Sequence, residues 1–271
     1  MLIQDTKCPN CGTYHDPTLE KCPGCNKNNE LFSLNRLPKR VLFLHPIVQI
    51  MMFLIGFAYA GMIVGEFIIA IYVRQIPGDD LIYKSLVMMC IVYCLMLFGL
   101  VTLVLSTRRK EAVSKFKNGH DYLFGLAYFG GLVLASIFLG LIINAFFTAP
   151  EEINSNQQMA DAVSKNYHIV SFILLGFVGP ICEELTYRVG LYSFLRRINV
   201  YLAVIVTTIV FAFIHFEFEA DNMAAELWAL PSYLISGFIL TMAYEHRGPA
   251  CSMTAHILYN LFAFALMFME K

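Results

Sequence analysis

The chain has 271 residues, of which 58% are hydrophobic and only 14% are charged. An ordinary globular domain carries about 25% charged residues, so this composition indicates an integral membrane protein rather than a soluble domain. The formal net charge of −1 gives no support to a nucleic-acid partner, because membrane topology accounts for the basic residues.

The N-terminal segment contains two Cys-x-x-Cys pairs, Cys8 with Cys11 and Cys22 with Cys25. Four thiolates at this spacing match the ligand set of tetrahedral zinc. Residues 1–35 are therefore predicted to form a structural zinc ribbon, and its fold should depend on the metal because the segment is too short for a sufficient core. A disulfide pair is disfavoured by the predicted cytoplasmic location, and a redox dithiol by the closed arrangement of the four cysteines.

Residues 36–43 form a predicted polar linker, and residues 44–270 a predicted transmembrane domain. About 20 helical residues cross a bilayer core, so apolar stretches of that length are candidate spans. Seven are found, at residues 44–73, 81–106, 121–147, 168–195, 199–216, 228–244 and 250–269. The first lies too far from the amino terminus for a cleaved signal peptide. The predicted fold class is an all-α polytopic membrane protein with about seven transmembrane helices and a small N-terminal zinc ribbon.

Lys and Arg residues concentrate before the first span, in the 107–119 loop, and in the turns at 196–198 and 245–249. The alternate loops around residues 150 and 220 are acidic. Since cytoplasmic loops retain positive charge, a multi-pass protein of the cell membrane with a cytoplasmic N-terminus is predicted.

The fourth predicted span contains Gly179-Pro180 just before two glutamates. Pro180 has no amide hydrogen, so the carbonyl of Gly176 loses its helical partner and a kink is predicted there. Charged groups inside a membrane are costly and mark functional sites. The break is therefore expected to open polar space where Glu183 and Glu184 enter.

Six polar residues are candidates for a shared site. Glu184 and Arg188 are spaced for a helical ion pair, which leaves Glu183 as the candidate general base. Glu183 lies sixteen residues before the turn near Asn199 and His215 sixteen after it, so a hairpin of these two spans places them at similar depth. His256 and Asn260 share one face of the last span. The sequence therefore predicts a polar pocket formed by three helices.

These residues form three motifs: Glu183-Glu184 with Arg188 (EExxxR), Phe211 with His215 (FxxxH), and His256 with Asn260 (HxxxN). In this order they resemble the CPBP intramembrane proteases, also called the Abi or CAAX-protease family, which includes the eukaryotic type II CAAX prenyl endopeptidase. The resemblance covers about residues 168–266. It implies hydrolysis of a peptide bond inside or beside the membrane.

By this resemblance Glu183 activates the attacking water, His215 helps to orient it, and His256 with Asn260 stabilises the oxyanion. Glu184 and Arg188 would hold the site together. The residue types agree, since amide hydrolysis needs a base and donors aimed at the developing negative oxygen. Two mechanisms stay open: a glutamate protease, which we favour, and a zinc enzyme with His215, His256 and a glutamate as ligands.

Two other functions remain in competition with proteolysis. A non-catalytic family member would bind peptides or regulatory partners in the same cavity, although such a protein tends to lose a catalytic group. A proton-coupled transporter also places Glu and His in the membrane, but no internal repeat is present. Membrane lipid and a peptide or protein substrate are the expected partners. For the ribbon, recruitment of a cytoplasmic partner and a simple cap on the first span are both open.

Overall fold

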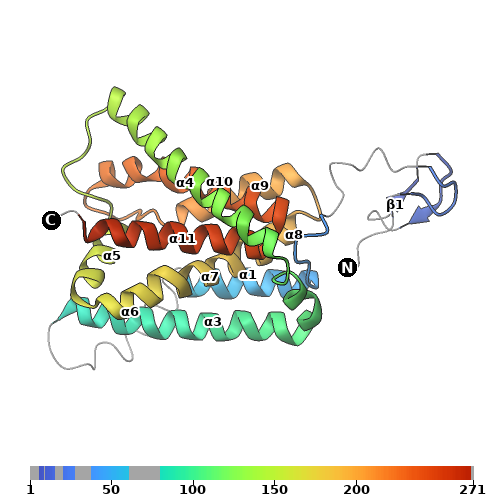
Figure 1. The fold of residues 1–271 in the computed structure, drawn as a ribbon, viewed down its shortest axis with the longest axis horizontal. Helices are drawn as coiled ribbons and strands as arrows, with labels where there is room; N and C mark the ends of the chain where they lie inside the picture. Colours follow the sequence, from blue (N-terminus) through green and yellow to red (C-terminus); the bar gives the residue numbers. More distant parts are fainter. Residues whose placement is uncertain (1–5, 9, 16–20, 28–37, 61–79, 270–271) are drawn as a thin grey trace.

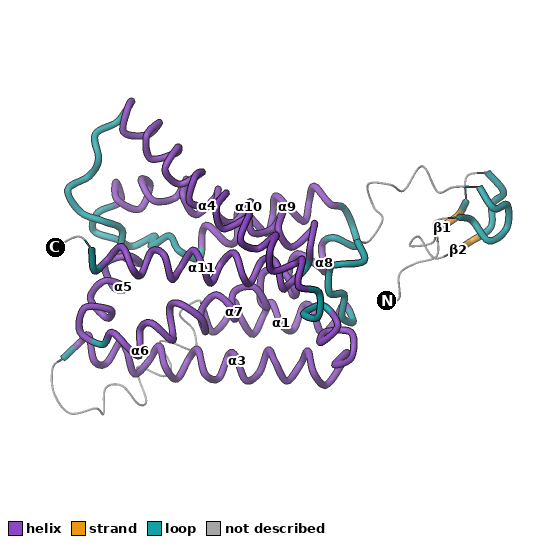
Figure 2. The backbone as a smooth tube through the Cα atoms, viewed as in Figure 1, coloured by secondary structure: helices purple, strands orange, loops and turns teal. Residues whose placement is uncertain are grey.

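A computed structural model of the chain describes residues 6–8, 10–15, 21–27, 38–60 and 80–269 (Figure 1). The N-terminal segment contains two short antiparallel strands, β1 (Thr6–Lys7) and β2 (Tyr14–His15). Thr6 pairs with His15 and Lys7 with Tyr14. The other regular elements of the described chain are helices, which loops connect, as Figure 2 shows.

Among the described residues, seven apolar helical segments belong to the membrane domain. Five are long and apolar enough to cross a membrane: α3 (Leu81–Ser114), α4 (Gly119–Phe146), the composite helix His168–Leu195, α10 (Met223–Arg247) and α11 (Pro249–Met267). Two are shorter apolar helices, α1 (Pro46–Ala60) and α9 (Val200–Phe213). The predicted fold class, an all-α polytopic membrane protein, is confirmed.

Some element boundaries differ from the prediction. The first predicted span continues to residue 73, and its residues 61–73 lie outside the described part of the chain. The span predicted at 199–216 is shorter in the structure. The helix ends at Phe213 and has 14 residues, or about 21 Å. An additional helix, α5 (Ser155–Asn166), occupies a segment predicted as a loop. It has too few apolar residues to give a membrane signal.

The fourth predicted span is a series of helical pieces: α6 (His168–Ile173), η3 (Leu174–Val178), α7 (Gly179–Glu183), η4 (Glu184–Tyr192) and α8 (Ser193–Leu195). The two η segments are π-helical, a geometry that often occurs at functional sites. Half of this span is buried inside the bundle, the largest share of the five. It packs against α1, α3, α9 and α11, so its side chains form the centre of the domain.

Candidate active site and metal centre

The Gly-Pro break changes the hydrogen-bond register of the central span. Instead of a simple kink, the helix widens into a π turn, and the Gly179 amide donates to the Leu174 carbonyl five residues back. The next donor in this register would be Pro180, which has no N–H. The Leu175 carbonyl instead accepts from Asn260 Nδ2 of α11 at 2.9 Å. The Asn260 side chain thus stabilises the backbone just before the two glutamates.

A buried ion pair forms directly after the break. Glu184 Oε1 lies 3.1 Å from Arg188 Nη1, and both side chains are almost fully buried, which confirms the predicted i,i+4 pair. Arg188 also donates to the Gly237 carbonyl of α10 at 3.3 Å. Its guanidinium carbon lies 4.3 Å from the centre of the Phe211 ring, a cation–π contact. Three helices therefore fix this guanidinium.

His256 connects the two glutamates. Its Nδ1 lies 3.0 Å from Glu184 Oε1, and because a carboxylate only accepts, Nδ1 carries the hydrogen. Its Nε2 lies 3.7 Å from Glu183 Oε2. One edge of the ring is thus fixed by a charge-assisted hydrogen bond and the other faces Glu183. This places His256 of α11 at the same depth as the glutamates of the central span.

His215 lies in the turn that follows α9. Its Nδ1 donates to the Phe211 carbonyl at 2.8 Å, so Nε2 presents its lone pair and lies 4.0 Å from Glu183 Oε2. The similar depth predicted for Glu183 and His215 is therefore confirmed. Glu183 Oε2 itself is buried without a hydrogen-bond partner among the described residues. Two imidazole nitrogens and one carboxylate oxygen thus converge on one position.

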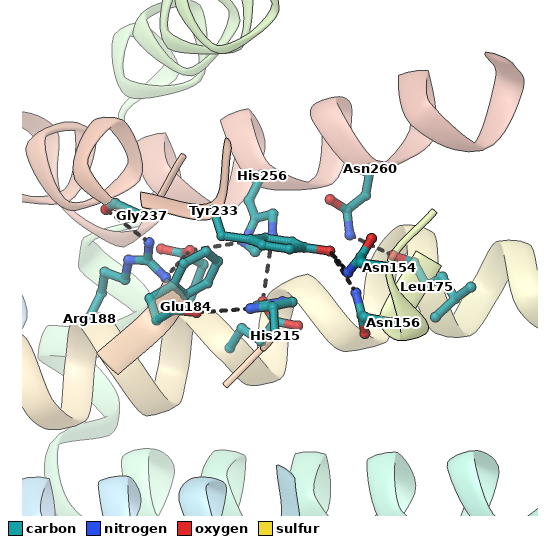
Figure 3. A network of polar contacts seen from close by, with 12 residues as sticks. Asn154, Asn156, Leu175, Glu184, Arg188, His215, Tyr233, Gly237, His256 and Asn260 are labelled. Carbon is teal, nitrogen blue, oxygen red and sulfur yellow. Dashed lines mark hydrogen bonds and ion pairs between the residues drawn. The ribbon is translucent and has the colours of Figure 1, made fainter. Parts of the chain in front are cut away.

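Sequence reasoning missed Tyr233 of α10. Its ring stacks on the His215 ring with centroids 4.6 Å apart and an angle of 17° between the planes. Its hydroxyl accepts from Asn154 Nδ2 at 3.2 Å and Asn156 Nδ2 at 3.1 Å, at the start of α5 (Figure 3). Tyr233 therefore connects the orientation of His215 to the start of α5. No local spacing in the sequence indicates such a contact between distant segments.

An apolar pocket leads to this site. Its volume is about 610 Å³, and its walls include Phe57 of α1 together with Ile209 and Phe213 of α9. His215 also lines the pocket, with Phe216 and Phe218 of the following turn. A hydrophobic segment in this pocket would therefore lie beside the His215 imidazole.

The six predicted site residues thus occupy two adjoining positions. Glu183, Glu184, Arg188, His215 and His256 form one contact cluster. The Asn260 amide nitrogen points to the Leu175 carbonyl, further along the same face of α11 as His256 (Figure 3). Its part in catalysis stays a prediction.

The four N-terminal cysteines come together as predicted. Their sulfur atoms all lie within 4.8 Å of one another, with 3.8 Å between Cys8 and Cys25 and 3.5 Å between Cys11 and Cys22. Zinc–sulfur bonds of about 2.3 Å in a tetrahedron require sulfur separations of about 3.8 Å, so the donors fit this metal. The separations are far above the roughly 2.05 Å of a disulfide bond.

The two cysteine pairs have matching backbone turns. The Gly12 amide donates to the Cys8 carbonyl at 2.8 Å, and the Asn26 amide donates to the Cys22 carbonyl at the same distance. Gly12 and Asn26 both have positive φ angles, of 74° and 56°. These residue types adopt such angles most readily, which explains why they directly follow the second cysteine of each pair. The cluster is therefore built from two equivalent loops.

The fold and the buried cluster define a polytopic helical membrane protein with carboxylate, imidazole and guanidinium groups at the centre of its bundle. Residues 165–262 match the family model for type II CAAX prenyl endopeptidase Rce1-like proteins. This match includes all six candidate catalytic residues and confirms the resemblance predicted from the three motifs.

Curated relatives are more distant. The UPF0177 protein YvdC of Lactococcus lactis subsp. lactis is 26% identical over 144 residues, covering 53% of this chain and 52% of the relative. An uncharacterized protein of Mycoplasma capricolum subsp. capricolum is 25% identical over 146 residues, covering 52% and 41%. The chain thus spans about half or less of the length of these relatives. No solved structure matches it.

Proposed function

We propose that this chain is an intramembrane endopeptidase that hydrolyses peptide bonds of membrane-associated or prenylated peptides, with water activated by Glu183. The observation that carries the proposal is the position of Glu183 Oε2. This buried atom lies 4.0 Å from His215 Nε2 and 3.7 Å from His256 Nε2. The Rce1-like match over residues 165–262 supports the same activity.

The Glu183–His215 pair suits a water molecule as nucleophile. Both facing atoms are acceptors, and 4.0 Å is too long for a direct hydrogen bond but fits a bridging water. Such a water donates one hydrogen to each group, which leaves an oxygen lone pair for attack on the scissile carbonyl. As the carbon–oxygen bond forms, Glu183 takes the proton and later returns it to the leaving amine.

His256 is proposed to stabilise the oxyanion. Its Nδ1 hydrogen is used by Glu184, so donation from Nε2 requires the doubly protonated ring. Two carboxylates, one guanidinium and one imidazolium give zero net charge, which is the least costly state for a buried cluster. Donation from this ring places a positive charge beside the developing negative oxygen. Asn260 is the second proposed donor, through the Nδ2 hydrogen that Leu175 does not use.

We favour the glutamate mechanism over a catalytic metal. Among the described residues, the four ribbon cysteines are the one group of at least three His, Cys, Asp or Glu residues placed to hold a metal ion, with ligand atoms within 4.8 Å of one another. Glu183, His215 and His256 are not such a group, and Glu184 already engages one nitrogen of His256. The metal assigned to the ribbon cysteines is zinc in a structural role, since four thiolates leave no open position.

The apolar pocket beside His215 supports a hydrophobic substrate. The distribution of Lys and Arg supports a cell-membrane protein with a cytoplasmic N-terminus, in which residues 1–35 form the ribbon and residues 36–43 the linker.

A peptide library tests the proposal. Purified protein in detergent is incubated with soluble, prenylated and transmembrane peptides, alongside Glu183→Gln and the matched surface variant Glu111→Gln. We expect cleavage of membrane-associated peptides by the wild-type protein and by Glu111→Gln, with loss in Glu183→Gln. Equal cleavage by both variants, or binding of peptides without cleavage by folded wild-type protein, would contradict it.

A further inference from the structure

The segment before α1 is firmly attached to one end of the helical bundle. We call residues 38–44 the strap. Its Val41, Leu42 and Leu44 side chains are buried. Three polar contacts hold the strap: an ion pair of Arg40 with Asp121 at 2.8 Å, and hydrogen bonds from Lys115 to the Lys39 carbonyl at 2.6 Å and from Arg197 to the Leu44 carbonyl at 2.7 Å. The strap thus has one defined position against α3, α4 and the turn after α8.

A chain of hydrogen bonds runs from the strap into the interior. The Leu42 amide donates to the Tyr244 hydroxyl at 3.3 Å. The Tyr244 and Ser193 hydroxyls lie 2.9 Å apart, and Ser193 donates to the Arg188 carbonyl at 2.9 Å. All members are buried. The Tyr244 hydroxyl also faces the Leu42 carbonyl at 3.3 Å. When its one hydrogen goes to Ser193, each hydroxyl accepts one bond and donates the next, an arrangement in which neighbouring bonds strengthen one another.

The far end of this chain is the active-site cluster. Arg188 receives the strap contact on its backbone carbonyl and holds Glu184 Oε1 with its guanidinium at 3.1 Å. Glu184 in turn fixes His256 at 3.0 Å. A displacement of the Arg188 backbone therefore moves the carboxylate that orients His256.

A second contact links the strap to α11. Gly248, between α10 and α11, has a φ of 79°, and a Cβ at this position would collide with the Arg40 carbonyl. The strap backbone therefore lies directly against the start of the helix that carries His256. Both routes lead from residues 40–42 to the same imidazole.

We propose that Tyr244 is a positioning residue that couples the strap to Arg188, so that the placement of the N-terminal segment sets the geometry of the active-site cluster. The consequence for catalysis rests on the function proposed above. The coupling itself is a property of the fold and is measurable without a substrate.

The test compares Tyr244→Phe with Tyr192→Phe. The two rings pack edge to face at 5.8 Å and both are fully buried, but the Tyr192 hydroxyl donates to Glu245 at 2.8 Å and not to the strap. Hydrogen exchange is followed by mass spectrometry in the full-length protein. In Tyr244→Phe we expect exchange of residues 184–192 to accelerate about fivefold, with little change in Tyr192→Phe. Equal acceleration in both variants would overturn the proposal.

Ser193→Ala interrupts the same chain at its next member. Combined with Tyr244→Phe it should add no further acceleration, because the connection is already broken; additive effects would overturn the coupling. With a cleavable substrate, Tyr244→Phe should lower kcat at unchanged KM, and a change in KM alone would count against positioning. If the wild-type protein cleaves nothing, the proposed function fails and the exchange experiment still decides the coupling.

Discussion

Arg188→Met tests how the buried cluster contributes to stability. The wild-type guanidinium is fully buried, 3.1 Å from Glu184, and also bonds the Gly237 carbonyl. Met keeps the unbranched apolar stem but has no guanidinium, so Glu184 is left as a buried carboxylate without its ion-pair partner. Removing one partner of a buried pair costs about 3–5 kcal/mol. We expect the free energy of unfolding to fall by about this amount.

Arg108→Met is the matched control. Arg108 Nη1 lies only 2.7 Å from Glu111 Oε2, closer than the buried pair, but its side chain is 55% exposed. Exposed pairs contribute about 0–1 kcal/mol, so this variant should be nearly neutral. Both proteins are unfolded reversibly in mixed detergent and followed by circular dichroism. Equal losses in the two variants would refute the argument that burial, rather than distance, determines the cost.

Three further changes have defined outcomes. Asn260→Leu leaves the Leu175 carbonyl without its donor and should cost about 1–3 kcal/mol in the same unfolding experiment; unchanged stability would contradict the π-turn assignment. Tyr233→Leu removes the stack on His215 and should lower kcat about two- to tenfold in steady-state assays, whereas Tyr233→Phe keeps the ring and should retain most of the rate. Cys8→Ser should release the bound metal, measured by elemental analysis, without lowering membrane-domain stability; full metal content would contradict the ribbon assignment.

The presence of the membrane helices could be predicted from the sequence, but the detailed course of the backbone could not. Long apolar runs identify the five candidate spans, because a bilayer requires about 20 such residues. Sequence reasoning placed a kink at the Gly-Pro step and could not specify the π turn, because that register depends on Asn260 from another helix. It also missed α5, which has few apolar residues and whose start contacts distant segments such as Tyr233.

The contacts in the candidate site were likewise predictable only in part. The Glu184–Arg188 pair follows from helical spacing, and the shared depth of Glu183 and His215 follows from their equal distance to the turn at Asn199. The contacts of His256 with both glutamates depend on the packing of α11 against the central span. No periodicity within the sequence contains that information.

The most direct test of the account is the rate of Glu183→Gln on a substrate identified in the library, with unfolding measured in parallel. Gln keeps the size of the side chain but cannot take a proton from water, so kcat should fall by about 10²- to 10⁴-fold at unchanged KM and stability. Chelator should leave the wild-type rate unchanged in a protein lacking residues 1–35. A folded Glu183→Gln protein that cleaves at the wild-type rate would contradict the central claim that Glu183 is the general base.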